Sequence, residues 1–171
     1  MTTPTTTSTT TNHATPTIAP AVLDTLMEAA YEQALKSYRE GGLPIGSVLA
    51  NRRGIVLAVG HNLRVQTGDP TAHAEVACIR NAGRRRDWHE LVLVSSLSPC
   101  VMCTGTTLLH RIPTVVIGEN ENFLGAEDLF ASRGVQVVNL RHAGCIELMR
   151  RFVREKPELW NEDIGVPPSE K

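Results

Sequence analysis

The sequence predicts an α/β protein in which helices cover both faces of a sheet. The first observation is a pair of continuous apolar runs of strand length, "LVLVSS" (91–96) and "TVVIG" (114–118). Such runs are typical of strands that are buried on both faces. The second observation is that segments with helical periodicity, such as residues 143–155, alternate with these runs. This alternation favours layers of helices on a sheet over a bundle or a sandwich.

The first third of the chain predicts a helix followed by a hairpin. Residues 21–40 combine strong helix formers with a helical period, and Gly41-Gly42 would end that helix. Residues 44–50 and 54–62 are expected to form two short strands that "NRRG" joins in a hairpin.

The remaining elements follow from the same kinds of signal. They are expected to be a polar loop over residues 63–70, a helix that begins after Thr71 and ends near Gly83, a strand over 91–96, a helix that begins near Ser98, a strand over 114–118, a loop from 119, a short helix over 126–133, a strand over 135–140 and a helix over 143–155.

Composition narrows the class of protein. At 171 residues and a net charge of −1, the chain suggests one domain and no polyanionic partner. No apolar run approaches the roughly 20 residues of a membrane span, so no membrane partner is expected. Residues 1–20 are rich in Thr and Pro, and we expect a disordered tail that is neither a secretory signal nor a transit peptide, followed by a domain over 21–171. Four cysteines without an export signal indicate reduced thiols or metal ligands, and a cytoplasmic location.

Two of the expected helix starts carry residues that could hold a metal ion. Cys100 and Cys103 follow Ser98, a candidate N-cap, at a spacing that puts both sulfurs on one side of the first turn. A helix N-terminus favours thiolate, which is the form that binds metal. A catalytic zinc takes three protein ligands and leaves one position for water. His73, at the start of the other helix, is the expected third ligand of one zinc ion per chain.

Glu75 is the candidate proton carrier of this site. It lies two residues after His73, and two helical residues differ by about 200°, so the two side chains cannot share a lateral face. A site beyond the end of the helix can be reached by both, because glutamate is long. Its carboxylate would then stand beside the water that zinc activates. The two helix starts together predict a hydrolytic centre.

The spacing H-x-E followed by P-C-x-x-C is the signature of the zinc-dependent nucleobase deaminases. Here it stands as His73-Ala74-Glu75 and Pro99-Cys100-Val101-Met102-Cys103. Beyond this motif the chain resembles the fungal-type zinc cytosine deaminases over nearly its whole length after the N-terminal tail. The segments that carry the resemblance are "GGLPIGSVL", "GHNLRVQTGDPTAHAE", "SLSPCVMCTG", "GENENF" and "WNEDIG".

The resemblance implies a fold, an activity and an assembly. The fold would be a three-layer α/β/α sandwich around a five-stranded mixed sheet, and the protein would be a homodimer. The activity would be hydrolytic deamination of a free nucleobase, cytosine, to uracil and ammonia. The partner would thus be a small molecule, and nucleic acid is not expected to be the substrate.

The resemblance also implies contacts to the edge of the base. Asn62 would hold the carbonyl side of the ring, with help from the backbone N–H of Ala74. Asp163 and the carbonyl of Ser98 would accept hydrogen bonds from the exocyclic amine. Ala74 stands where the family pattern has Gly, and Asn161 stands where it has an aromatic residue, which would make the roof of the pocket more polar.

Contacts to the faces of the base are implied in the same way. Phe123 and Trp160 would sandwich the ring, and Ile45 and Leu97 would line the pocket. The C-terminal segment 157–171 would fold back over the pocket as a lid.

Other interpretations stay open. Cys100 and Cys103 could form a redox pair, although such a pair has no use for an H-x-E motif on a second helix. A non-catalytic zinc module that binds a partner is a second alternative, against which Glu75 argues. An RNA-editing deaminase would need a broad basic surface, for which the run Arg84–Arg86 is thin support. The nearest alternative is deamination of another small cyclic amidine, such as creatinine, a modified pyrimidine or guanine.

Overall fold

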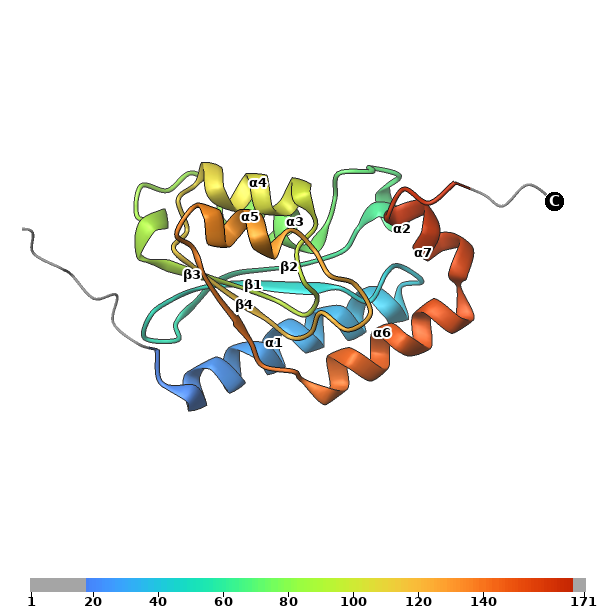
Figure 1. Ribbon diagram of the computed structural model, residues 1–171, viewed down its shortest axis with the longest axis horizontal. Coiled ribbons are helices and arrows are strands. Elements are labelled where there is room, and N and C mark those ends of the chain that lie inside the picture. Colours follow the sequence, from blue (N-terminus) through green and yellow to red (C-terminus); the bar gives the residue numbers. More distant parts are fainter. Residues whose placement is uncertain (1–17, 168–171) are drawn as a thin grey trace, which may run out of the picture.

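The computed structural model describes residues 18–167, which contain one mixed five-stranded sheet with strand order β2-β1-β3-β4-β5 (Figure 1). Strand β1 is antiparallel to both β2 and β3, whereas β3, β4 and β5 run parallel. This confirms the mixed sheet. The strands are β1 (Gly46–Asn51), β2 (Val56–His61), β3 (Leu91–Ser95), β4 (Thr114–Ile117) and β5 (Gln136–Asn139).

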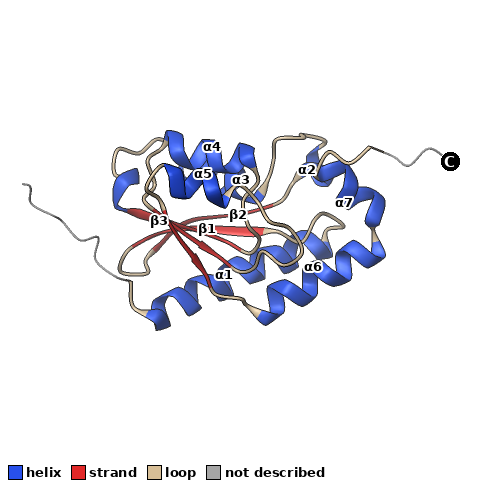
Figure 2. Ribbon diagram, viewed as in Figure 1, coloured by secondary structure: helices blue, strands red, loops and turns tan. Residues whose placement is uncertain are grey.

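Helices cover both faces of the sheet, which confirms the three-layer architecture. Figure 2 shows α1 and α6 on one side of the strands and α3, α4 and α5 on the other. The short helices α2 and α7 lie together at one end of the molecule. The helices are α1 (Pro20–Arg39), α2 (Arg64–Thr67), α3 (Ala74–Ala82), α4 (Val101–Leu109), α5 (Glu127–Ser132), α6 (Ala143–Glu155) and α7 (Pro157–Asp163), with a 3-10 turn at Trp88–Glu90. No helix within residues 18–167 has the length and apolar character needed to cross a membrane.

The two-residue period of the strands divides the core into two clusters. In β1, Val48 and Ala50 pack with Leu26 and Met27 of α1, whereas Leu49 between them packs on the opposite face. The cluster on that opposite face contains buried residues of α3 and α5 together with the other sides of β3 and β4. Burial on both faces explains why β3 and β4 are continuously apolar in sequence.

A third apolar cluster lies where α6 and α7 meet the segment before β1, the start of α3 and the loop after β3. It joins segments that are far apart in sequence. Its buried members are Leu43, Ile45, Ala74, Leu97, Met149, Phe152 and Trp160.

Two element boundaries differ from the sequence prediction. Helix α1 begins at Pro20, and Ile18 packs against the core, so ordered structure starts inside the segment expected to be a tail. Residues 1–17 of that expected tail lie outside the described residues. A short helix, α2, occupies part of the expected loop, because the Asn62 side chain accepts the N–H of Arg64 and Gly68 ends the turn at φ +71°.

The predicted N-caps of the two functional helices were wrong by two residues. Helix α3 begins after His73 and α4 begins after Cys100, so two of the three expected metal ligands are themselves the N-cap residues. The residues predicted as caps bind elsewhere: the Thr71 hydroxyl donates to Asp69, and the Ser98 hydroxyl donates to Glu127.

The position of α3 on the sheet depends on Gly60 of β2. A methyl group at this position would lie 2.6 Å from the carbonyl oxygen of Ala74 and closer still to the backbone nitrogen of Cys78. Helix α3 therefore packs with its backbone against the strand, which only a residue without a side chain permits.

We expect Gly60→Ala to lower the free energy of unfolding by about 1–3 kcal/mol, the usual cost of overpacking a close contact. The substitution must push away the first turn of α3, so it should also reduce the metal content of the purified protein. Chemical denaturation and metal analysis measure the two effects. An unchanged denaturation midpoint would show that α3 does not depend on this close approach.

Candidate metal centre and active site

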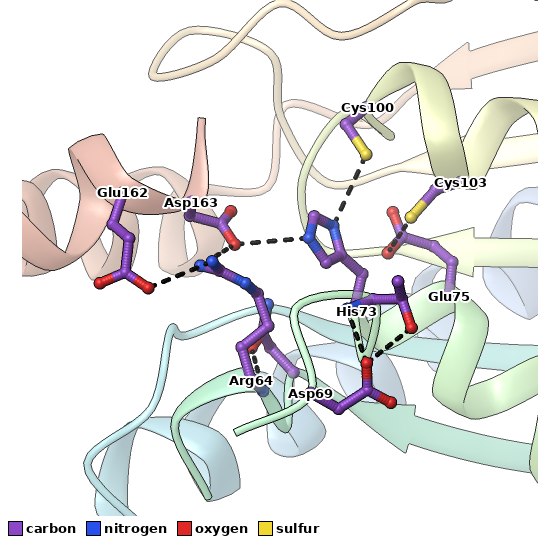
Figure 3. Close-up of polar contacts among 10 residues, drawn as sticks. Arg64, Asp69, His73, Glu75, Cys100, Cys103, Glu162 and Asp163 are labelled. Atoms are coloured by element: carbon purple, nitrogen blue, oxygen red, sulfur yellow. Dashed lines mark hydrogen bonds and ion pairs between the residues drawn. The ribbon is translucent and has the colours of Figure 1, made fainter. Parts of the chain in front are cut away.

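Three side chains at the N-terminal ends of α3 and α4 form a site whose donors fit zinc. The Cys100 Sγ and His73 Nδ1 atoms are 3.5 Å apart, and all three ligand atoms of His73, Cys100 and Cys103 lie within 4.8 Å of one another (Figure 3). In a tetrahedral zinc site with bonds of about 2.1 Å to nitrogen and 2.3 Å to sulfur, such donors lie about 3.6 Å apart. One imidazole and two thiols in this arrangement are therefore a zinc-type donor set.

The site favours the thiolate form that zinc requires. The hydrogen bond from Cys103 lowers the pKa of the Cys100 thiol to about 4, and His73 adds to this effect although burial opposes it. Both Cys100 and His73 stand in extended conformation at the N-terminus of a helix, where the unpaired N–H groups carry partial positive charge. The other two cysteines, Cys78 and Cys145, are buried in the apolar clusters, where burial raises the pKa of each to about 12.

Glu75 lies in the first turn of α3 and is buried. One carboxyl oxygen accepts a hydrogen bond from the Ser95 hydroxyl at 3.1 Å, and the other lies 3.4 Å from the Cys103 sulfur. Burial raises the pKa of this carboxyl group, which suits a residue that must both take and give a proton near neutral pH. Because His73 precedes the helix rather than lying in it, the 200° separation expected between the two side chains does not apply.

The outer nitrogen of His73 faces an acidic residue from the end of the chain. Asp163 Oδ1 is 3.4 Å from His73 Nε2 and 2.8 Å from Nη1 of Arg64 (Figure 3). Burial raises the pKa of Asp163, although the charges of His73 and Arg64 act in the opposite direction. Metal-binding histidines commonly donate their second N–H to a carboxylate in this way.

A cavity of about 550 Å³ adjoins the site. His73, Glu75 and Cys100 form part of its wall, so two of the three metal donors face the same space as the candidate proton carrier. The other residues in its lining that the sequence predicted are Ile45, Leu97, Ser98, Phe123, Trp160 and Asp163. Those that the sequence did not predict include Pro70, Val101, Met102, Leu124 and Ile164.

Two predicted ring contacts do not belong to the lining of this cavity. Ala74 is buried in the third apolar cluster. Asn62 is buried beside Ile45, whose carbonyl accepts the Asn62 N–H. The Asn62 Oδ1 atom accepts the N–H of Arg64, whereas its Nδ2 atom is buried without a partner among residues 18–167. Asn62 thus holds a spare hydrogen-bond donor in a fixed orientation.

Phe123 and Trp160, the two residues expected to sandwich the base, have perpendicular rings in this structure. The rings of Phe123 and Trp160 contact edge to face, with centroids 5.8 Å apart and an angle of 88°. Two perpendicular rings form a corner, whereas a base held between two faces needs parallel rings. Packing of Trp160 against Phe152 and Leu43 accounts for this orientation. The expected polar roof is also absent from the described cavity wall, because Asn161 is not among its lining residues.

Glu119 is a structural residue of the site that sequence reasoning missed. Its buried carboxylate accepts the backbone N–H groups of Glu121 and Asn122, and its carbonyl accepts the N–H of Ser98. It thereby shapes the loop that places Phe123 at the cavity. The acidic residue directly after the apolar strand β4 was the available signal.

Comparison with known proteins agrees with this geometry. Residues 21–119 match the model of the cytidine and deoxycytidylate deaminase zinc-binding region. The chain is 48% identical over 141 residues to cytosine deaminase of Candida albicans, an alignment that covers 81% of this chain and 94% of that protein. It is 34% identical over 144 residues to a tRNA-specific adenosine deaminase of Streptococcus pyogenes, with coverage of 77% and 90%.

Similarity extends to solved structures. A structure from a study of A-to-I editing by tRNA:A34 deaminases has a TM-score of 0.64 and 28% identity, and covers 73% of this chain and 99% of that one. The matched family region includes His73, Glu75 and both cysteines of the metal centre. The chain therefore belongs to the cytidine and deoxycytidylate deaminase family, with its zinc-binding region.

Proposed function

We propose that this protein is a zinc-dependent hydrolase that converts free cytosine to uracil and ammonia. The observation that carries the proposal is that three zinc-type donors lie together and that two of them, His73 and Cys100, share one cavity wall with the buried Glu75. The 48% identity to a cytosine deaminase, over 94% of that protein, supports cytosine as the base.

His73, Cys100 and Cys103 would hold one zinc ion per chain. When bound there, zinc supplies Lewis-acid activation of a water molecule. Glu75 takes a proton from the attacking water, gives it to the ring nitrogen beside the reacting carbon, and passes a second proton to the departing amine. A carbon–oxygen bond replaces the carbon–nitrogen bond, and ammonia leaves. The Ser95 hydroxyl holds one oxygen of Glu75 in place during these transfers.

Although Asn62 is not part of the cavity wall, its buried Nδ2 donor without a partner among residues 18–167 supports a ring that carries a carbonyl group. Because its oxygen is already bound to the Arg64 N–H, it can offer only its Nδ2 donor. A carbonyl oxygen of the ring would accept a hydrogen bond from Nδ2, whereas an N–H group of the ring in the same place would leave Nδ2 unpaired. An unpaired polar group is costly in a buried site. The carbonyl of Ser98 is proposed to accept a hydrogen bond from the exocyclic amine. The N–H of this residue is already bound to Glu119 and its hydroxyl to Glu127.

The location of the basic residues supports a small substrate over RNA. Arg84–Arg86 follow the C-terminal end of α3, whereas the metal donor His73 lies at its N-terminal end. Nine helical residues separate the two ends by about 13 Å. One of these arginines, Arg85, is also paired with Asp87. Phosphate contacts at this place would not border the cavity.

The four cysteines are free thiols, which supports a cytoplasmic enzyme.

We also propose that the protein is a homodimer that associates through α4. Val101 and Leu109 are 68% and 78% exposed, and eight residues of separation put both on the same side of the helix. Exposed apolar residues that share one helix face are typical of a surface that a partner covers.

One prediction of this proposal concerns metal binding and proton transfer. The purified protein should contain one zinc ion per chain, and Cys100→Ser with Cys103→Ser should remove it, whereas Cys78→Ala should not. Glu75→Gln should keep the zinc but lower turnover by about 100-fold or more, because it can no longer accept a proton. Metal analysis and ammonia release measure these effects. Full zinc occupancy in the double variant would refute the ligand set.

The second prediction concerns the substrate. Ammonia release should be far faster from cytosine than from cytidine, guanine or creatinine, and undetectable from tRNA. The reason is that α7 contributes Trp160, Asp163 and the following Ile164 to the wall of the cavity, where a ribose would need room. Equal rates with cytosine and cytidine would contradict the proposal, and a preference for guanine would replace cytosine as the substrate.

The third prediction concerns assembly. Light scattering should give a mass of twice the 18.7 kDa chain. Leu109→Glu should shift the protein toward the monomer, because a charge would be buried in the interface. Ile55→Glu is the matched control, since Ile55 is also exposed but lies on the hairpin between β1 and β2. A wild-type monomer, or a dimer that Leu109→Glu leaves intact, would contradict this interface.

A further inference from the structure

We propose that Arg64 is a positioning residue that holds Asp163 against the outer nitrogen of His73 and so fastens the end of α7 over the metal site. The inference rests on the proposed zinc site, but assigns a role to a residue that touches neither the metal donors nor the base. Its basis is a buried pair of charges that joins α2 to α7.

Arg64 binds two acidic residues at the end of α7. Its Nη1 atom lies 2.8 Å from Asp163 Oδ1, and its Nη2 atom lies 3.3 Å from Glu162 Oε1 (Figure 3). The Arg64 and Asp163 side chains are only 11% and 5% exposed, whereas Glu162 is 68% exposed. The contact with Asp163 is therefore the desolvated one, and charge pairs of that kind depend strongly on both partners.

The position of Arg64 is set by the site itself. Its backbone N–H donates to the side chain of Asn62, and the N–H of Leu63 donates to the carbonyl of Ala72, next to His73. The guanidinium group thus projects from a turn that is hydrogen-bonded to the loop just before His73. Its contact with Asp163 therefore links that loop to α7.

One oxygen atom of Asp163 links Arg64 to the metal donor His73. Asp163 Oδ1 faces both Arg64 Nη1 and His73 Nε2. A carboxylate that accepts the Nε2 proton keeps that proton away from Nδ1, the atom that faces Cys100. Without Arg64, the buried Asp163 would lose its close positive partner and would move toward water. His73 would then lose the contact that sets its orientation and tautomer.

The other anchors of α7 lie elsewhere, so the effect should be local. Trp160 packs with Leu43 and Phe152, and the Lys156 amine donates to the carbonyl of Gly41. These contacts hold the beginning and middle of the helix. Arg64 holds its last residues, directly before Ile164 and Gly165 of the cavity wall. Removing Arg64 should free this end without unfolding the protein.

The test uses zinc-loaded, full-length protein and follows transfer of zinc to a chromogenic chelator. Arg64→Met keeps the apolar stem but removes the charge, and we expect zinc release to be about 10-fold faster or more, the usual effect of losing support for a metal-binding histidine. Arg64→Lys should be intermediate, because an amine can reach Asp163 alone. The matched control is Glu162→Gln, which removes the exposed partner and should release zinc at the wild-type rate.

A double-mutant cycle with Asp163→Asn separates the effect of the Arg64–Asp163 contact from a general loss of stability. If Arg64 acts through Asp163, adding Arg64→Met to Asp163→Asn should give little further acceleration. Additive effects, wild-type zinc release from Arg64→Met, or equal acceleration in Glu162→Gln would each overturn the proposal. Should Arg64→Met fail to fold, Arg64→Lys in the same cycle provides the test. Absence of zinc from the wild-type protein would instead refute the proposed function.

Discussion

The site depends on a fixed separation between the first turns of α3 and α4. Each helix presents a metal donor from its N-cap residue, His73 or Cys100, so the distance between two helix ends becomes the distance between two ligands. The sheet sets that distance. Helix α3 packs its backbone directly on Gly60 of β2, and α4 follows β3 after a short loop. A rigid packed core thereby determines a geometry that ligand side chains alone could not hold, since free rotamers would spread the donors apart.

The charges at the site also depend on how the first turns of α3 and α4 are placed. Two helix N-termini bring partial positive charge to one place, which favours the thiolate of Cys100 and offsets part of the cost of burying negative groups there. Burial raises the pKa of both Glu75 and Asp163, but their partners differ. Glu75 is bound only to neutral groups, the Ser95 hydroxyl and the Cys103 thiol. Asp163 is bound to the guanidinium of Arg64, whose positive charge acts against the rise in its pKa and favours a carboxylate beside His73. One carboxyl group is thus suited to move protons and the other to hold a ligand.

The sequence predicted the parts of the site that are local in the chain. His73 and Glu75 are two residues apart, Cys100 and Cys103 are three apart, and helix geometry turns such spacings into positions. Contacts between distant segments could not be predicted in this way. Arg64 and Asp163 are separated by 99 residues, and no local pattern signals that they meet. The angle between Phe123 and Trp160 was missed for the same reason, because it is set by packing against Phe152 of another helix. The N-caps were misplaced because Thr71 and Ser98 have the usual capping side chains, but each binds a nearby acid instead.

Some residues of the site lie inside the region that matches the family model, and others follow it in the chain. The matched family region ends at residue 119 and contains every candidate metal donor and Glu75, so the residues proposed to activate water all lie inside it. Phe123, Trp160 and Asp163 all follow residue 119 and lie on a loop and on α7. Part of the cavity wall thus lies outside the region that matches the family, whereas the metal centre lies entirely inside it. Arg64 lies within the shared region but binds α7, and this places it at the junction where the covering segment is tied to the centre that it covers.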